Sequence, residues 1–120
     1  MAERNRIINQ TRGTEVATDV RWATNAWPRL LGLMGRPDLP GGHALVFPGE
    51  KGIHTHFMRF AIDVVFYGPD GRVVALAHAM APWRSSKYHR TAAGLIELPS
   101  GTLRATGTEP GDQLSLVKRG

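Results

Sequence analysis

The sequence predicts a mainly β domain, built as a jelly-roll-like β-sandwich or a partly closed barrel with two short helices. Short apolar segments recur along the chain, and turns rich in glycine and proline separate them. Strands and helices do not alternate as they would in an α/β protein with a parallel sheet. The length of 120 residues fits one domain over residues 1–120, and the 42% hydrophobic content suffices for a core.

The first third of the chain predicts a hairpin followed by a helix. Residues 5–12 and 15–22 alternate polar and apolar side chains, with Gly13 between them, which is typical of two paired strands. Residues 25–34 then carry apolar side chains at helical spacing, namely Trp27, Leu30, Leu31 and Met34. Gly35 and Pro37 follow, and both are typical of a helix end.

The rest of the chain predicts mostly strands, at residues 44–47, 53–58, 62–67, 72–80, 93–98 and 113–117. The letters YGPDGR predict a hairpin between two of them, because proline presets the turn and Asp-Gly supplies the reversal. A second short helix is expected after Pro99 and Ser100, closed by Gly107.

Composition narrows the classes of function. The absence of cysteine excludes disulfides, thiol catalysis and cysteine-ligated metals. No apolar run is long enough to span a bilayer and no signal peptide is evident, so we expect a cytoplasmic protein without a membrane partner. We also expect a monomer. The net charge is +5, but the basic residues are scattered, which favours a solvated basic surface over nucleic-acid binding.

Four segments in this order resemble one known family: GLMGR (32–36), IHTHFMRFAIDVVF (53–66), PWR (82–84) and LIELPSGT (95–102). This family is catalogued as domain of unknown function number 192, and the resemblance runs from residue 16 to residue 117. It implies a small mainly β domain with a jelly-roll-like sandwich, and it implies no activity. Family members often carry an aromatic residue where this chain has His56 and proline where it has Ala61, which argues against His56 as an essential ligand.

Two histidines form the clearest candidate for metal binding. His54 and His56 lie two residues apart, so on a strand their imidazoles would share one face. Histidine is a frequent metal ligand, and a carboxylate such as Asp63 would complete a facial triad for Fe(II). The simpler interpretation, which we prefer, is one hydrogen-bonded and one exposed histidine.

Asp63 is a second candidate, because it interrupts the apolar strand AIDVVF. A buried carboxylate without a partner is costly, so we expect an arginine beside it, with Arg36, Arg59 and Arg84 as candidates. We favour a structural ion pair over a ligand site. In the functional alternative, Asp63 and the arginines line a pocket for a small anion or polar ligand.

The loop 82–91, with the sequence PWRSSKYHRT, mixes aromatic and basic residues. Such a mixture can bind phosphates and stack on bases, and loops often carry function. The alternative is a loop in which Trp83 fills the core while its basic tip stays in water.

These observations predict a binding or accessory module for a small anionic or polar ligand or a protein partner. Its candidate ligand-binding residues are Arg36, His54, Arg59, Asp63, Trp83 and Arg84. The alternatives are a cupin-like metal-dependent enzyme using His54 and His56, and a basic surface that binds nucleic acid. No GxSxG, P-loop or GxGxxG motif is present, so no cofactor, no metal ion and no catalytic residue is assigned, and enzymatic activity stays an open question.

Overall fold

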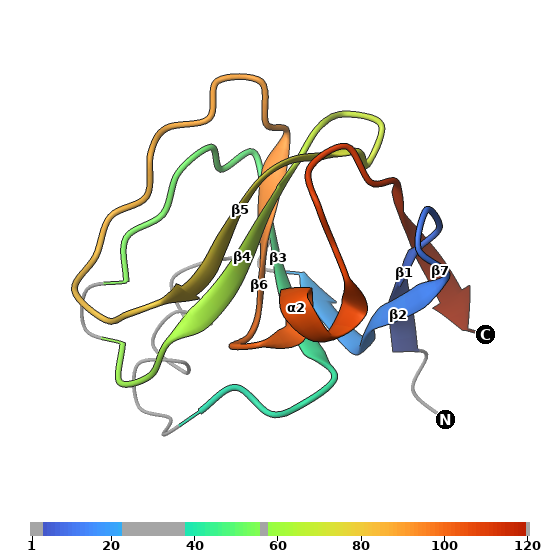
Figure 1. The fold of residues 1–120 in the computed structure, drawn as a ribbon, viewed down its shortest axis with the longest axis horizontal. Coiled ribbons are helices and arrows are strands. Elements are labelled where there is room, and N and C mark those ends of the chain that lie inside the picture. Colours follow the sequence, from blue (N-terminus) through green and yellow to red (C-terminus); the bar gives the residue numbers. More distant parts are fainter. Residues whose placement is uncertain (1–3, 23–37, 56–57, 120) are drawn as a thin grey trace.

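The computed structural model describes residues 4–22, 38–55 and 58–119, which form one curled seven-stranded sheet (Figure 1). The strands are β1 (Arg4–Asn9), β2 (Thr14–Trp22), β3 (His43–Pro48), β4 (Ile62–Tyr67), β5 (Val73–Met80), β6 (Gly94–Pro99) and β7 (Leu114–Arg119). Their order in the sheet is β5-β4-β6-β3-β2-β1-β7. The fold is therefore mainly β, and the sheet curls into a half-barrel rather than dividing into two layers.

The pairing of the strands is antiparallel except between β2 and β3. The two edge strands of the sheet, β5 and β7, approach each other where the β4–β5 turn meets the chain before β7. There Val73 N–H donates to the Asp112 carbonyl at 2.8 Å and Leu114 N–H donates to the Gly71 carbonyl at 3.1 Å. These bonds join the two ends of the sheet at one point, as in the predicted partly closed barrel.

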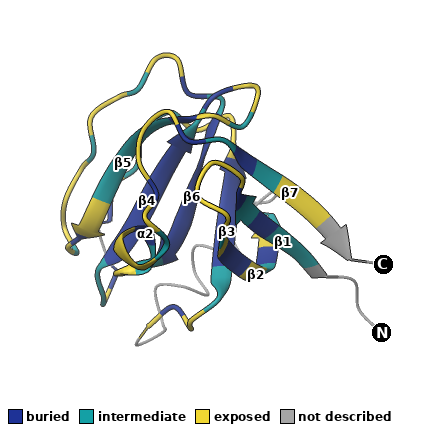
Figure 2. Cartoon of the chain, turned by 45° about the vertical axis from the view of Figure 1, so that its right-hand side comes forward, coloured by how far each residue is buried: buried dark blue, intermediate teal, exposed yellow. Residues whose placement is uncertain are grey.

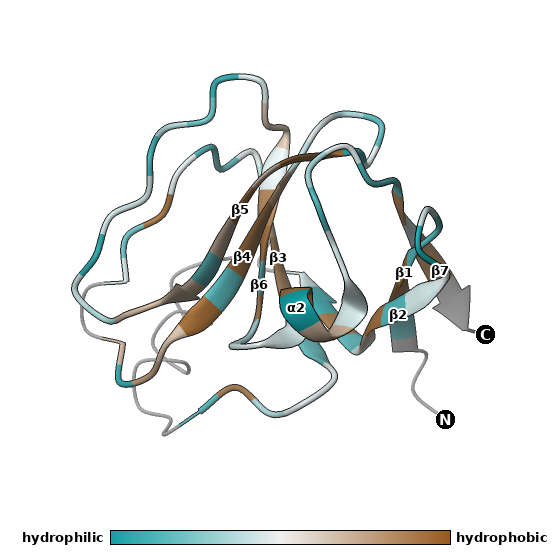
Figure 3. Cartoon of the chain, viewed as in Figure 1, coloured by the Kyte–Doolittle hydropathy of each residue, from teal (hydrophilic) through white to brown (hydrophobic). Residues whose placement is uncertain are grey.

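Apolar side chains pack on both faces of the central strands, which Figure 2 shows as buried and Figure 3 as hydrophobic. One cluster lies inside the curl and draws on nearly every strand as well as on the helix. The second lies on the other face of β3, β4 and β6 and includes Leu39, Met58 and Ala92 from the connecting segments. Because β4 is buried on both faces, its sequence shows no alternation.

Most of the predicted elements are confirmed. The hairpin of β1 and β2, the YGPDGR hairpin of β4 and β5, and the later strands β6 and β7 lie where the sequence placed them. The short helix α2 (Thr102–Thr106) ends at Gly107, whose φ of 68° is left-handed as expected for such a cap. Within the described ranges, α2 is the one helix, since the predicted helix over 25–34 lies outside them.

One predicted strand does not join the sheet. Within the expected strand 53–58, the described residues form only an isolated bridge between His54 and Ser85. The described part of this segment pairs with the loop 82–91 rather than with a strand of the sheet. Along the described part of the chain, no helix is long and apolar enough to cross a membrane.

Candidate functional site

The loop 82–91 is held by a second segment, residues 51–55, and the two run side by side outside the sheet. We call this pair the ribbon. Backbone hydrogen bonds join it along its length, from Thr55 N–H to the Arg84 carbonyl at 2.8 Å, from Ser86 N–H to the Ile53 carbonyl at 2.8 Å, and from His89 N–H to the Lys51 carbonyl at 2.8 Å. The loop is therefore fixed at three successive places.

Side chains add further restraints to the ribbon. The hydroxyl of Thr55, which is fully buried, donates to the Ala81 carbonyl at 2.6 Å and accepts from Arg84 N–H at 3.0 Å. At the other end, Lys51 Nζ donates to the carbonyls of Arg90 and Ala92 at 2.8 and 3.0 Å. The ammonium group of Lys51 is thus part of the scaffold.

Trp83 occupies an unusual position at the start of the ribbon. Its φ is 64°, a left-handed conformation that is rare for a bulky residue, and its side chain is 59% exposed. Its N–H donates to the Thr55 carbonyl at 3.1 Å, which holds this backbone in place. The alternative in which Trp83 fills the core is wrong, since the side chain lies at the surface. Strained residues often cluster at functional sites.

A groove lies on each side of the ribbon. The first, of about 450 Å³, lies against the 49–54 segment and is lined by residues 49–54, Ser85, Ser86 and Tyr88. The second, of about 410 Å³, lies between the ribbon and the sheet, and we call it the β5 groove. Its lining residues are Phe66, Leu76, Ala77, Met80, Arg84, Ser85, Ser86, Lys87 and His89.

The β5 groove combines positive charge with apolar surface. Arg84 and Lys87 are exposed, and neither aspartate nor glutamate occurs among the described residues that line the groove. The ring of His89 packs on Phe66 with a centroid separation of 4.2 Å and an interplanar angle of 47°. By contrast, the groove on the other side of the ribbon contains Glu50. The described lining of the β5 groove thus carries basic but no acidic side chains.

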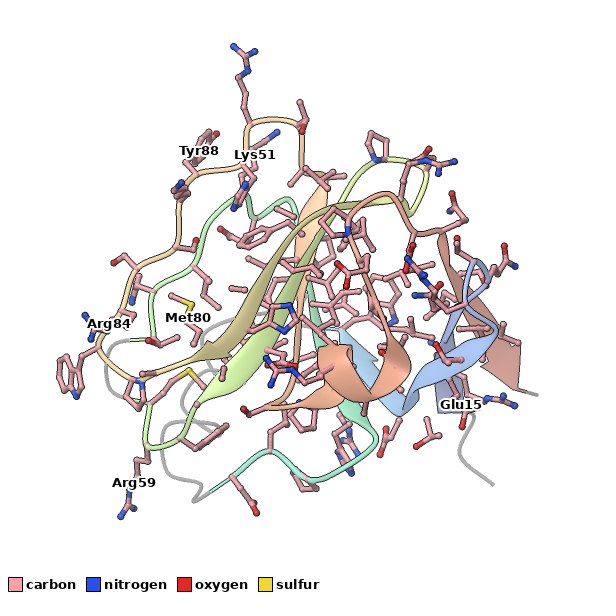
Figure 4. The ribbon with its side chains drawn as sticks, in the orientation of Figure 1. Glu15, Lys51, Arg59, Met80, Arg84 and Tyr88 are labelled. Atoms are coloured by element: carbon pink, nitrogen blue, oxygen red, sulfur yellow. The ribbon has the colours of Figure 1, made fainter. Side chains whose placement is uncertain are left out.

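The structure does not bring the six sequence-predicted residues into one pocket. His54, Trp83 and Arg84 belong to the ribbon, but His54 lines the first groove and Arg84 the second. Arg59 and Arg84 are both exposed and point outward from different loops on one side of the molecule (Figure 4). Arg36 lies outside the described residues.

Asp63 has partners other than the expected arginine. Its carboxylate accepts hydrogen bonds from the N–H groups of Ala79 at 2.8 Å, Gly101 at 3.1 Å and Leu103 at 2.9 Å. No arginine in the described ranges forms an ion pair with it. The prediction of an Asp63–arginine pair is thus not supported, because backbone amides near α2 and β5 satisfy the carboxylate instead.

The contact with Ala79 has a geometric cause. The pairing of β4 with β5 shifts register between Ile62 and Val64, so that an extra residue of β5 lies opposite Asp63. Such a bulge leaves a backbone N–H without a strand partner, and Asp63 accepts the bond from Ala79, whose φ is 46°. Asp63 thereby fixes the end of β5, where Met80 lines the β5 groove.

Glu97 is a buried ionisable residue that sequence reasoning did not select. It is 1% exposed and lies between Leu45 of β3 and Val64 of β4 on the apolar outer face of the sheet. Its Oε2 atom has no hydrogen-bond partner among the residues that the structure describes, and burial raises the pKa of Glu97 to about 8. The only signal in the sequence was a glutamate inside the apolar run LIEL.

The metal-site alternative receives no support from the described residues. His56 lies outside them, and His54 is exposed at the ribbon. Within the parts of the chain that the structure describes, no three histidine or carboxylate side chains gather closely enough to hold a metal ion.

Comparison with known proteins places the chain in a family. Residues 7–116 match the model of the domain of unknown function 192, described as "Uncharacterized ACR". The chain belongs to this family. A UPF0127 protein of Pyrococcus furiosus is 38% identical over 114 residues, covering 90% of this chain and 95% of the relative. A UPF0127 protein of Thermococcus kodakarensis is 36% identical over 115 residues, covering 91% of this chain and 71% of the relative.

Two solved structures share the fold of this DUF192 chain. A protein from Sinorhizobium meliloti described as a putative transcription regulator has a TM-score of 0.71 at 24% identity, covering 95% of this chain and 93% of that one. A protein of unknown function from Novosphingobium aromaticivorans has a TM-score of 0.72 at 18% identity, covering 92% of this chain and 82% of that one. At these identities the likeness shows the fold alone.

Proposed function

We propose that this chain is a binding module that holds a small anionic ligand in the β5 groove. The observation that carries the proposal is the grouping of Arg84, Lys87 and His89 around a groove that has no acidic residue among its described lining. An arginine guanidinium matches a carboxylate or phosphate with two parallel hydrogen bonds, and a lysine adds a point charge.

The rigidity of the ribbon supports the proposal. Its backbone hydrogen bonds hold Arg84 and Lys87 in place before any ligand arrives, which reduces the entropy that binding must overcome. The strained backbone of Trp83 lies next to Arg84 and is part of the same arrangement. Of the six residues predicted from the sequence, we retain Arg84 as a ligand contact and assign Asp63 to positioning the end of β5.

Thermal unfolding with a set of anions tests this proposal. Phosphate, sulfate and hexanoate are added to the protein at constant ionic strength, with chloride as the reference. We expect a saturable rise in the melting temperature, because a ligand at 100 times its Kd adds about 2.7 kcal/mol of stability. The double variant Arg84→Gln/Lys87→Gln should bind at least about tenfold more weakly, since a hydrogen bond to a charged group contributes roughly 1.5–3 kcal/mol.

A matched control removes the same charge elsewhere. Arg21 and Arg104 are both exposed and lie outside the β5 groove, so Arg21→Gln/Arg104→Gln should respond to anions as the wild type does. If both double variants lost the response to anions equally, the effect would come from the overall charge, and the proposal would be contradicted. A response to a short oligonucleotide that both variants weaken equally would instead indicate non-specific binding of a polyanion.

A further inference from the structure

We infer that the ligand of the β5 groove is an amphiphilic anion, with a carboxylate or phosphate head group on an aliphatic or aromatic tail. This inference rests on the proposed function and specifies the part of the ligand that the basic residues do not recognise. It follows from how charge and apolar surface are distributed in the groove.

The two sides of the groove differ in chemistry. The ribbon contributes Arg84 and Lys87, together with the hydroxyl-bearing residues Ser85 and Ser86. The sheet contributes only apolar side chains, namely Phe66, Leu76, Ala77 and Met80. Figure 4 shows Met80 and Arg84 on the same side of the molecule, from the end of β5 and from the ribbon. A ligand with one charged and one apolar end would complement both sides.

The apolar side is accessible. Leu76 and Ala77 lie on β5, an edge strand of the sheet, and both are only partly buried. The His89 ring packs on Phe66, which is fully buried. Ala77 packs against the outer cluster, whereas Leu76 packs against the inner cluster and reaches the groove from the edge of β5. An apolar tail would cover the surface that these two residues leave exposed, which a small hydrated anion would leave in water.

Arg84 and Lys87 are the ribbon residues that we expect to contact the head group of the ligand. The Ser86 hydroxyl already accepts from Ile53 N–H at 2.9 Å and donates to the Lys87 carbonyl at 2.9 Å, so it belongs to the scaffold. The volume of about 410 Å³ falls within the roughly 300–1,000 Å³ typical of small-molecule sites. The groove therefore has room for a tail as well as a head group.

Calorimetric titration with a homologous series tests the inference. The series is acetate, butyrate, hexanoate and octanoate, each below the concentration at which it aggregates. Burial of one methylene group should tighten binding about threefold to fourfold until the groove is filled. Butyl and hexyl phosphate form a parallel series that separates the contribution of the head group from that of the tail.

Two variants with the same substitution localise the effect. Leu76→Asn should reduce the gain in affinity per methylene group, because it removes apolar surface from the sheet side of the groove. The control Leu116→Asn should leave the gain in affinity per methylene group unchanged. Leu116 is partly exposed and lies on β7, at the opposite edge of the sheet. If Leu76→Asn does not fold, Met80→Gln addresses the same side of the groove, and the wild-type series alone still measures the dependence on tail length.

The outcomes separate the inference from the proposed function. Equal affinity for phosphate, acetate and octanoate, with loss in Arg84→Gln/Lys87→Gln, would overturn the amphiphilic ligand and leave the anion site intact. The same dependence on tail length in Leu76→Asn and the wild type would also overturn the inference. Binding to anionic lipid vesicles without binding to monomeric hexanoate would point to a membrane surface and would overturn it too. If no anion binds, the proposed function itself fails.

Discussion

Two buried carboxylates in neighbouring strands have opposite surroundings. Asp63 and Glu97 are each 1% exposed, but Asp63 accepts three backbone hydrogen bonds, whereas Oε2 of Glu97 accepts none from the described part of the chain. Hydrogen bonds to a carboxylate favour its charged form, and burial without them favours the protonated form. The two residues should therefore respond to substitution and to pH in different ways.

The first prediction concerns pH and Glu97. Its pKa is raised to about 8, so the folded state keeps a proton that the unfolded state, with an ordinary pKa of 4.5, releases. The contribution of Glu97 to the free energy of unfolding should be largest below pH 4.5 and should fall toward pH 8, by roughly 1 kcal/mol per pH unit. Urea unfolding between pH 5 and pH 8 measures this slope. Glu97→Gln should flatten it, and an unchanged slope in that variant would refute the assignment.

The second prediction concerns Asp63. Asp63→Asn replaces one acceptor oxygen with a donor group that faces backbone N–H groups, so it should lower the free energy of unfolding by about 2–4 kcal/mol. Asp70→Asn, at an exposed site, serves as the control and should stay within about 0.5 kcal/mol of the wild type. Equal, small effects of both substitutions in urea titrations would show that the Asp63 contacts contribute little.

The ribbon shows what a sequence pattern can and cannot specify for one element. The sequence predicted a strand over residues 53–58, but a predicted strand does not reveal its partner. The partner is residues 82–89, which the sequence marked only as a basic aromatic loop. The site arises from this non-local pairing, so the sequence pointed to Arg84 and Trp83 and could not place Leu76 or Met80 beside them.

The third prediction concerns the turn that joins the two edges of the sheet. Gly71 and Gly111 both have left-handed backbones, with φ of 84° and 91°. A Cβ atom at Gly71 would lie 2.7 Å from the Leu114 carbonyl oxygen, whereas a Cβ atom at Gly111 would meet nothing within 4 Å. Gly111→Ala should therefore lower the free energy of unfolding by about 1–2 kcal/mol, which is the cost of a left-handed backbone for alanine. Gly71→Ala should lower it further, because its Cβ atom also meets the Leu114 carbonyl oxygen.

Thermal unfolding of both glycine variants measures this difference. Gly71→Ala should also accelerate exchange of the Leu114 amide hydrogen, because that N–H donates to the Gly71 carbonyl. Equal destabilisation of the two variants would mean that the close contact with Leu114 is relieved without disturbing the junction.

At the scale of the whole molecule, the sequence predicted the fold class and most local elements. It did not predict which distant strands pair with each other. Hairpins and most strand ranges followed from alternation and from turn residues such as those of YGPDGR. The parallel pairing of β2 with β3 and the insertion of β6 between β4 and β3 join segments distant in sequence, which local patterns do not encode. The β5 groove is likewise non-local, because residues of β4 and β5 line it together with the ribbon.

Chemical-shift mapping would show whether and where an anion binds in the β5 groove. ¹⁵N-labelled protein is titrated with hexanoate, and the backbone amide shifts are followed. We predict saturable shifts grouped in residues 76–80 of β5 and 84–89 of the ribbon, and their loss in Arg84→Gln/Lys87→Gln. Shifts confined to other parts of the protein, or no saturable shifts at all, would contradict the account.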